Sequence, residues 1–133
     1  MSQAALLQVS NISWSAEQTN ILDSISFEMK KGSFVGLIGP NGAGKSSLMR
    51  CIYRVNKPDS GLILFEGENI WQGSVNANAR NMAVILQEQS EHLGLSVYEV
   101  VALGLTPRKK LFEWDTPEDK QQIQTVLNDN ELT

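Results

Sequence analysis

The chain has 133 residues, of which 41% are hydrophobic and 20% are charged, and its formal net charge is −4. These values are typical of one globular domain and exclude a disordered chain. The acidic balance provides no basic surface for nucleic acid, no apolar run reaches the ~18 residues of a membrane span, and the N-terminus lacks a secretory signal, so we expect a cytoplasmic protein.

The first third of the chain predicts strands and one helix. Residues 6–14 and 25–30 alternate apolar and polar side chains, which predicts antiparallel strands with one solvated face. Residues 33–38 form a short apolar run, which predicts a parallel strand buried on both faces. Residues 46–53 carry apolar side chains at helical spacing, and the lone Cys51 in that helix is expected to be a packed core thiol.

The middle of the chain predicts two further strands. Residues 56–61 are rich in turn formers and end the helix, and residues 62–65 then predict a strand of a small sheet, with Glu66 in the turn that follows. Residues 82–86 predict a second parallel strand buried on both faces. Gln87 stands at its carboxyl end, where open α/β sheets bind ligands.

Two helices are predicted near the C-terminus. Ser96 and Glu99 match a capping box, which opens a helix that Gly104 stops and whose inward residues are Val97, Val100 and Val101. The segment that begins at Thr116 and Pro117 opens another helix, with one apolar face made of Ile123, Val126 and Leu127.

One motif decides the functional interpretation. The pattern G-x-x-x-x-G-K-[ST] is complete in Gly39, Pro40, Asn41, Gly42, Ala43, Gly44, Lys45, Ser46 and Ser47. The glycines let the backbone curl with its N–H groups inward, and the following helix presents unpaired donors and the positive end of its dipole to phosphates. Lys45 is expected to reach the β- and γ-phosphates and the Ser46 hydroxyl to ligate Mg²⁺, with Ser47 as a helper. The expected ligand is a nucleoside triphosphate.

Together with Trp14 after the first strand, residues 21–27 and the strand that ends at Gln87, this loop resembles the ATP-binding subunits of ABC transporters over nearly the whole chain. Pro40 and Asn41 within the glycine frame are typical of that family. The resemblance implies an α/β fold: a P-loop NTPase (RecA-like) core with an antiparallel β subdomain and the beginning of a helical subdomain, incomplete. Residues 1–87 would form the core with the β subdomain, and residues 88–133 the Q-loop and a truncated start of the helical subdomain.

The resemblance also implies roles for particular residues. Trp14 takes the place of the aromatic that stacks on adenine, although a half-buried strand tryptophan is the alternative interpretation. Gln87 takes the place of the glutamine that touches Mg²⁺ and the attacking water, and Gln89 is close enough to be confused with it. Lys45 and Gln87 are then the catalytic residues, Ser46 and Gln87 the metal ligands, and ATP and Mg²⁺ the cofactors. Residues 95–107 are most similar to importers of metal chelates such as iron siderophores, haem or cobalamin.

Several motifs of the family do not occur in these 133 residues. The sequence has no Leu-Ser-Gly-Gly-type signature, no apolar strand closed by Asp-Glu after Gln87 and no later switch histidine, since His92 falls just past Gln87. The apolar run that ends at Glu66 precedes Gln87 and is assigned to the small sheet. Without an acidic general base, hydrolysis by this chain alone should be very poor. We therefore expect a fragment of a longer ATPase.

The expected function is to couple ATP binding and hydrolysis to transport across a membrane, with import of a metal chelate as the subgroup. The expected partners are a transmembrane permease subunit and a second ATP-binding subunit, at the inner face of the cell membrane, with no nucleic acid. Two alternatives stay open: a truncated nucleotide-binding or interaction module without turnover, and a soluble ABC-type ATPase of translation or DNA repair. The acidic balance and the sequence from residue 87 to 104 speak against the latter.

Overall fold

The structure is a computed structural model that describes residues 4–86, 94–109 and 116–131. The chain forms two compact units, residues 1–78 and residues 79–133. Within the described ranges, no helix is both long enough and apolar enough to cross a membrane.

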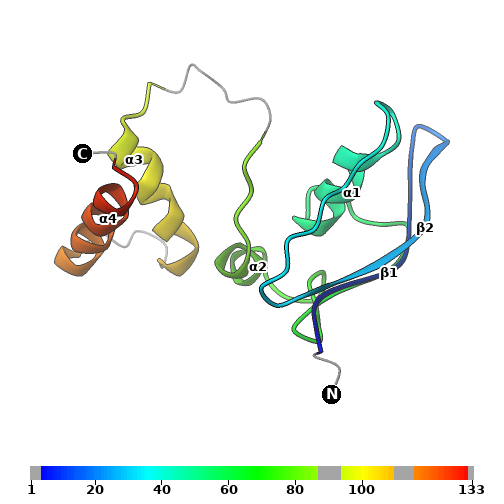
Figure 1. Cartoon of the computed structure of the whole chain (residues 1–133), viewed down its shortest axis with the longest axis horizontal. Coiled ribbons are helices and arrows are strands. Elements are labelled where there is room, and N and C mark those ends of the chain that lie inside the picture. Colours follow the sequence, from blue (N-terminus) through cyan, green and yellow to red (C-terminus); the bar gives the residue numbers. More distant parts are fainter. Residues whose placement is uncertain (1–3, 87–93, 110–115, 132–133) are drawn as a thin grey trace. The chain divides into compact units, whose positions relative to one another are not determined.

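The first unit is built on a four-stranded antiparallel sheet in the order β2-β1-β3-β4. Its strands are β1 (Ala5–Ala16), β2 (Thr19–Lys30), β3 (Ser60–Phe65) and β4 (Glu68–Asn69), and the long β1–β2 hairpin is prominent in Figure 1. Both hairpin turns use two residues with positive φ, Glu17 with Gln18 and Glu66 with Gly67. Two-residue turns of this kind match the twist of the flanking strands. The predicted antiparallel strands and the turn position of Glu66 are thereby confirmed.

Helix α1 (Lys45–Ile52) contacts β2 and completes the core of this unit. The buried side chains come from β1, β2 and β3, from α1 and from the segment after β4; they are Leu7, Val9, Ile12, Leu22, Leu48, Cys51, Ile52, Ile63 and Ile70. Cys51 is fully buried, which confirms the expected core thiol, and this burial together with the negative charge of Asp59 raises the pKa of the thiol. A further helix, α2 (Val75–Asn81), was not predicted from the sequence.

The second unit is helical. It contains α3 (Val97–Ala102), the 3₁₀ helix η1 (Leu103–Arg108) and α4 (Pro117–Asp129). Both predicted helix starts carry a capping box: the side chains of Ser96 and Thr116 accept hydrogen bonds from the N–H groups of Glu99 and Asp119.

The apolar face of α3 is shifted by one position along the chain from the prediction. Val97 and Val100 are about half exposed, and on α4 Val126 is 40% exposed. The residues that pack on the buried side chains of α4 are Tyr98, Val101, Ala102 and Leu105. These residues have the i, i+3, i+4, i+7 spacing of one helix face. Tyr98 therefore takes the inward position that was predicted for Val97. Gly104 does not stop the helix either, since the chain continues through it as η1.

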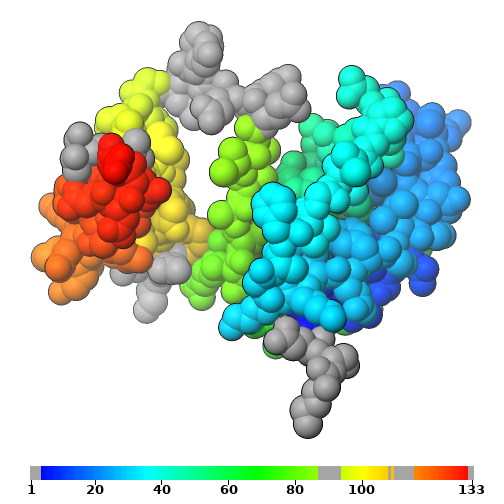
Figure 2. Space-filling model, in the orientation of Figure 1, coloured from blue at the N-terminus to red at the C-terminus, as the bar shows by residue number. Residues whose placement is uncertain are grey.

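The two predicted parallel strands are wrong as descriptions of this structure. Residues 33–38 and 82–86 lie outside any helix or strand, and Phe34, Ile38 and Ile85 are 100%, 96% and 90% exposed. The cyan segment that contains residues 33–38 lies at the surface of the first unit in Figure 2. A doubly buried strand needs neighbours on its edges and layers on its faces. None of the described strands pairs with either segment.

Candidate phosphate-binding site

The glycine-rich segment 39–44 forms an exposed loop that leads directly into α1. The N–H of Ala43 donates to the carbonyl of Pro40 at 3.1 Å, which closes the loop into a tight turn. Gly42 and Gly44 have φ values of 85° and 93°. Residues with a β-carbon rarely adopt these angles, so the glycines allow a curl that other residues would resist.

The N-terminus of α1 is left open at this loop. The N-cap residue is Gly44, which has no side chain that could cap the helix. The Gly44 carbonyl accepts a hydrogen bond from the N–H of Leu48 at 2.9 Å. No acidic side chain lies in the first turn. The first N–H groups and the positive end of the helix dipole are therefore available to an anion.

The Lys45 side chain folds over the loop. Its ammonium group donates hydrogen bonds to the carbonyl oxygens of Gly39 and of Pro40, the latter at 2.8 Å. The only cation inside the motif thus lies within the curl of the backbone, where carbonyl oxygens hold it. A phosphate oxygen in the same place would accept the same donors with a full negative charge, which makes a stronger hydrogen bond than a neutral carbonyl.

Trp14 lies on β1, next to the part of the sheet that meets the loop. It is half-buried, and its partner across the β1–β2 ladder is Leu22. A β-carbon placed at Gly44 would lie 3.0 Å from Leu22 Cδ2 and 3.1 Å from the carbonyl oxygen of Ile21. The end of the phosphate loop therefore packs directly on the strand that pairs with Trp14. The structure thus brings Trp14 and residues 39–47 into one region of the first unit.

The described residues fit a magnesium ion only in part. The exposed Ser46 offers a hydroxyl oxygen in the first turn of α1, and Mg²⁺ prefers oxygen ligands. Gln87, predicted as the second ligand, lies outside the described residues, as do Gln89 and His92. Among residues that are described, no group of three or more His, Cys, Asp or Glu could hold a metal ion. Ser47 is half-buried beside Ser46, and Asn41 is exposed in the loop.

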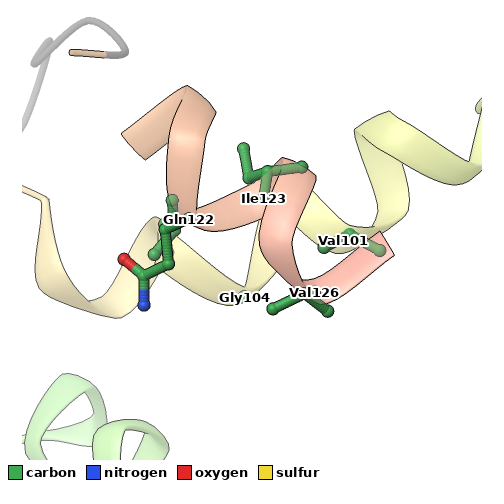
Figure 3. A pocket seen from close by; sticks show the side chains of 6 residues that line it. Val101, Gly104, Gln122, Ile123 and Val126 are labelled. Atoms are coloured by element: carbon green, nitrogen blue, oxygen red, sulfur yellow. The ribbon is translucent and has the colours of Figure 1, made fainter. Parts of the chain in front are cut away.

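The second unit has a groove of about 260 Å³ between η1 and α4. Figure 3 shows Gly104 together with Gln122, Ile123 and Val126 around it. The lining is mostly apolar and includes none of the residues that the sequence assigned to a site.

Sequence reasoning did not assign any role to Leu22. It noted the segment that contains this residue but not that Leu22 would touch the loop, because the contact joins residues 22 positions apart through the tertiary structure. The available signal was weak: Leu22 is an apolar residue beside the hairpin turn, opposite the aromatic residue.

Comparison with known proteins relates the chain to one family. Two relatives are the zinc uptake system ATP-binding protein ZurA of Listeria innocua, 36% identical over 137 residues, and the galactose/methyl galactoside import ATP-binding protein MglA of Clostridium perfringens, 35% identical over 108 residues. The alignments cover 96% and 80% of this chain but 50% and 21% of those proteins. The chain thus spans at most about half the length of these relatives.

The fold is also that of solved members of this family. The structure of cbiO1 from Clostridium perfringens, described as part of the ABC transporter complex cbiONQ, superposes with a TM-score of 0.77 at 23% identity, covering 96% of this chain and 51% of cbiO1. A P-loop NTPase fold is therefore shown, although residues 33–38 and 82–86, predicted as its parallel strands, lie outside any strand here. A family model described as ABC transporter matches residues 22–133, which include the phosphate loop from its first glycine to its last serine. The chain belongs to the ABC transporter family, in which ZurA and MglA are ATP-binding proteins.

Proposed function

We propose that residues 39–47 bind the triphosphate of ATP and that the chain belongs to the energy-coupling ATPase subunit of a membrane transporter. The observation that carries this proposal is the open N-terminus of α1, preceded by two glycines with positive φ and covered by the Lys45 ammonium group. These features provide unpaired N–H groups at the helix start, a helix dipole and one cation, and each of the three favours phosphate binding.

In this mechanism Lys45 exchanges the carbonyl oxygens of Gly39 and Pro40 for oxygens of the β- and γ-phosphates. The N–H groups at the start of α1 neutralise the remaining phosphate charge. Ser46, with Gln87, would hold Mg²⁺, which neutralises charge on the β- and γ-phosphates when it is bound. Trp14 offers a flat aromatic surface on which adenine can stack.

The partners and the cargo of this proposal are inferred by analogy with the family. A transmembrane permease and a second ATP-binding subunit would complete the transporter, with this chain at the inner face of the membrane. cbiO1, which shares the fold, is described as part of the ABC transporter complex cbiONQ. We propose import of a metal or metal chelate, because residues 95–107 resemble that subgroup and ZurA belongs to a zinc uptake system. MglA is named for import of galactose and methyl galactoside, so the relatives differ in cargo. The metal cargo is therefore proposed separately from ATP binding.

The test is ATP binding by the wild type, by Lys45→Ala and by Lys57→Ala, measured by calorimetry with Mg²⁺ present. Lys57 lies outside the loop and controls for the loss of a positive charge. We expect Lys45→Ala to abolish tight binding, a loss of at least about 100-fold or 2.7 kcal/mol, while Lys57→Ala leaves the affinity within about twofold. Equal affinity of wild type and Lys45→Ala would contradict the assignment.

A second measurement separates the transporter from the alternatives. Co-purification of the full protein with a permease from detergent-solubilised membranes supports a transporter. ATP binding without turnover, and without any membrane protein, would instead favour a nucleotide-binding module.

A further inference from the structure

Only one glycine of the phosphate loop lies against the sheet. A β-carbon at Gly42 would meet nothing within 4 Å, and one at Gly39 would meet only Ala43 and Lys45 of the loop and its helix. A β-carbon at Gly44 would instead lie 3.0 Å from Leu22 Cδ2, 3.1 Å from the carbonyl oxygen of Ile21 and 3.3 Å from Ile21 Cγ2. The loop therefore meets the sheet at Gly44, which lies against Leu22 and Ile21 of β2.

Leu22 also lies opposite the aromatic residue in the sheet. It is the direct partner of Trp14 in the β1–β2 ladder, and the pairing is irregular on both sides of Trp14. Directly opposed residues in an antiparallel pair point to the same face and lie about 4.5–5.5 Å apart at their β-carbons. Leu22 is 3% exposed, so it is held in the core and cannot move without disturbing its neighbours.

We propose that Leu22 is a positioning residue that sets the separation between Trp14 and the phosphate loop, and thereby favours ligands that carry a base at a fixed distance from a triphosphate. The inference rests on the proposed function, since it assumes that Trp14 holds the base and residues 39–47 hold the phosphates. A ligand that reaches two sites gains affinity from the second contact only when the geometry lets it engage both at once. Leu22 supplies that geometry without touching the nucleotide.

The test compares two probes, ATP and inorganic tripolyphosphate, on the full chain. Leu22→Val removes one carbon at the contact with Gly44 and keeps an apolar core residue. The matched control is Ile63→Val, which removes one carbon from a side chain that is 1% exposed in the same sheet. A further variant, Trp14→Ala, removes the aromatic surface. Circular dichroism of each variant verifies that the sheet is retained.

We expect Leu22→Val to weaken ATP binding about tenfold and tripolyphosphate binding by less than about threefold, because the phosphate contacts alone do not depend on the distance to Trp14. Ile63→Val should leave both affinities unchanged. In the Trp14→Ala background the effect of Leu22→Val on ATP should disappear, which shows that the two residues act together.

Four results would overturn the inference. Equal losses for both probes would mean that Leu22 only supports the loop. An unchanged ATP affinity in Leu22→Val, or the same loss in Ile63→Val, would mean that the contact has no specific role. Equal affinity of the wild type for ATP and tripolyphosphate would remove the contribution of the base. If the wild type binds neither probe, the proposed function itself fails, so the two failures are distinguishable.

Discussion

Replacing Arg54 by alanine and by glycine should separate a backbone cost from a side-chain contribution at the end of α1. The N–H of Val55 donates to the Arg50 carbonyl at 2.8 Å, and the N–H of Arg54 to that of Cys51 at 3.4 Å. These two bonds define a Schellman motif, in which the residue at the position of Arg54 adopts the left-handed conformation that glycine prefers. Arg54 has a φ of 67°. An L-residue there costs about 1 kcal/mol relative to glycine.

The Arg54 side chain offsets this cost by two contacts. Its guanidinium carbon lies 5.1 Å from the centre of the Trp71 ring, and Nη1 donates to the carbonyl of Gly73 at 2.6 Å. A half-buried cation–π contact contributes about 1 kcal/mol, and a hydrogen bond from a charged donor about 1.5 kcal/mol. The buried Nε of Arg54 and Nε1 of Trp71 have no acceptor among the residues that the structure describes, which reduces the net gain. We take about 2 kcal/mol for the side chain as a whole.

Arg54→Ala should therefore destabilise the first unit by about 2 kcal/mol, because it loses both contacts and keeps the unfavourable φ. Arg54→Gly loses the same contacts but relieves the backbone, so it should cost only about 1 kcal/mol. Urea unfolding followed by tryptophan fluorescence gives the free energies, since Trp71 reports directly on the contact. Hydrogen exchange at the Val55 amide then reports on the end of the helix alone.

The difference between the two variants is the decisive quantity. If Arg54→Gly is as unstable as Arg54→Ala, the left-handed backbone at this position carries no strain that glycine relieves. If Arg54→Ala has the same midpoint of urea unfolding as the wild type, the stacking and the hydrogen bond contribute nothing to stability.

Two further predictions concern the sheet and α4. Gly61→Ala should destabilise the first unit by about 3 kcal/mol in urea unfolding, because the new β-carbon would lie 2.3 Å from the Asn11 carbonyl oxygen at a φ of 99°. The control is Gly67→Ala, which should cost about 1 kcal/mol, because Gly67 also has a positive φ but a β-carbon there would meet no atom within 4 Å. Equal losses would refute the clash. A hydrogen bond from the Thr116 N–H lowers the pKa of the Asp119 carboxyl, so its contribution to α4 should be complete above the ordinary pKa of Asp and lost as the pH falls through the lowered value. Helix content by circular dichroism between pH 6 and 2 measures this loss, which Asp119→Asn should abolish.

The sequence predicted those features of the site that depend on consecutive residues. Residues 39–47 follow one another in the chain, and their glycines, lysine and serines determine the curl, the open helix end and the cation. It could not predict the contact between Leu22 and Gly44, which requires the packing of α1 on β2. Apolar patterning shows that Leu22 is buried, but not which residue it meets.

The same distinction explains which strands were predicted correctly. β1 and β2 are joined by a two-residue turn, so each has a pairing partner close by in the sequence. A similar turn joins β3 to the two-residue strand β4, which was not predicted. A parallel strand has its partner at a distance, across a crossover of a dozen or more residues. The apolar runs 33–38 and 82–86 therefore have the composition of buried strands, but the neighbouring sequence offers neither of them a pairing partner.

This arrangement leaves the phosphate loop anchored unequally at its two ends. At the carboxyl end, Gly44 begins α1 and packs on β2, while at the other end residues 33–38 pair with no described strand. Phosphate binding requires that the backbone of residues 39–43 be held in one conformation, and ordering each residue costs about 1–2 kcal/mol. Any contact that held residues 33–38 in a sheet would supply part of that order beforehand and so strengthen nucleotide binding. By linkage, bound ATP would strengthen the same contact by the same factor. The affinity of residues 39–47 for ATP and the strength of the contact made by residues 33–38 would therefore rise and fall together.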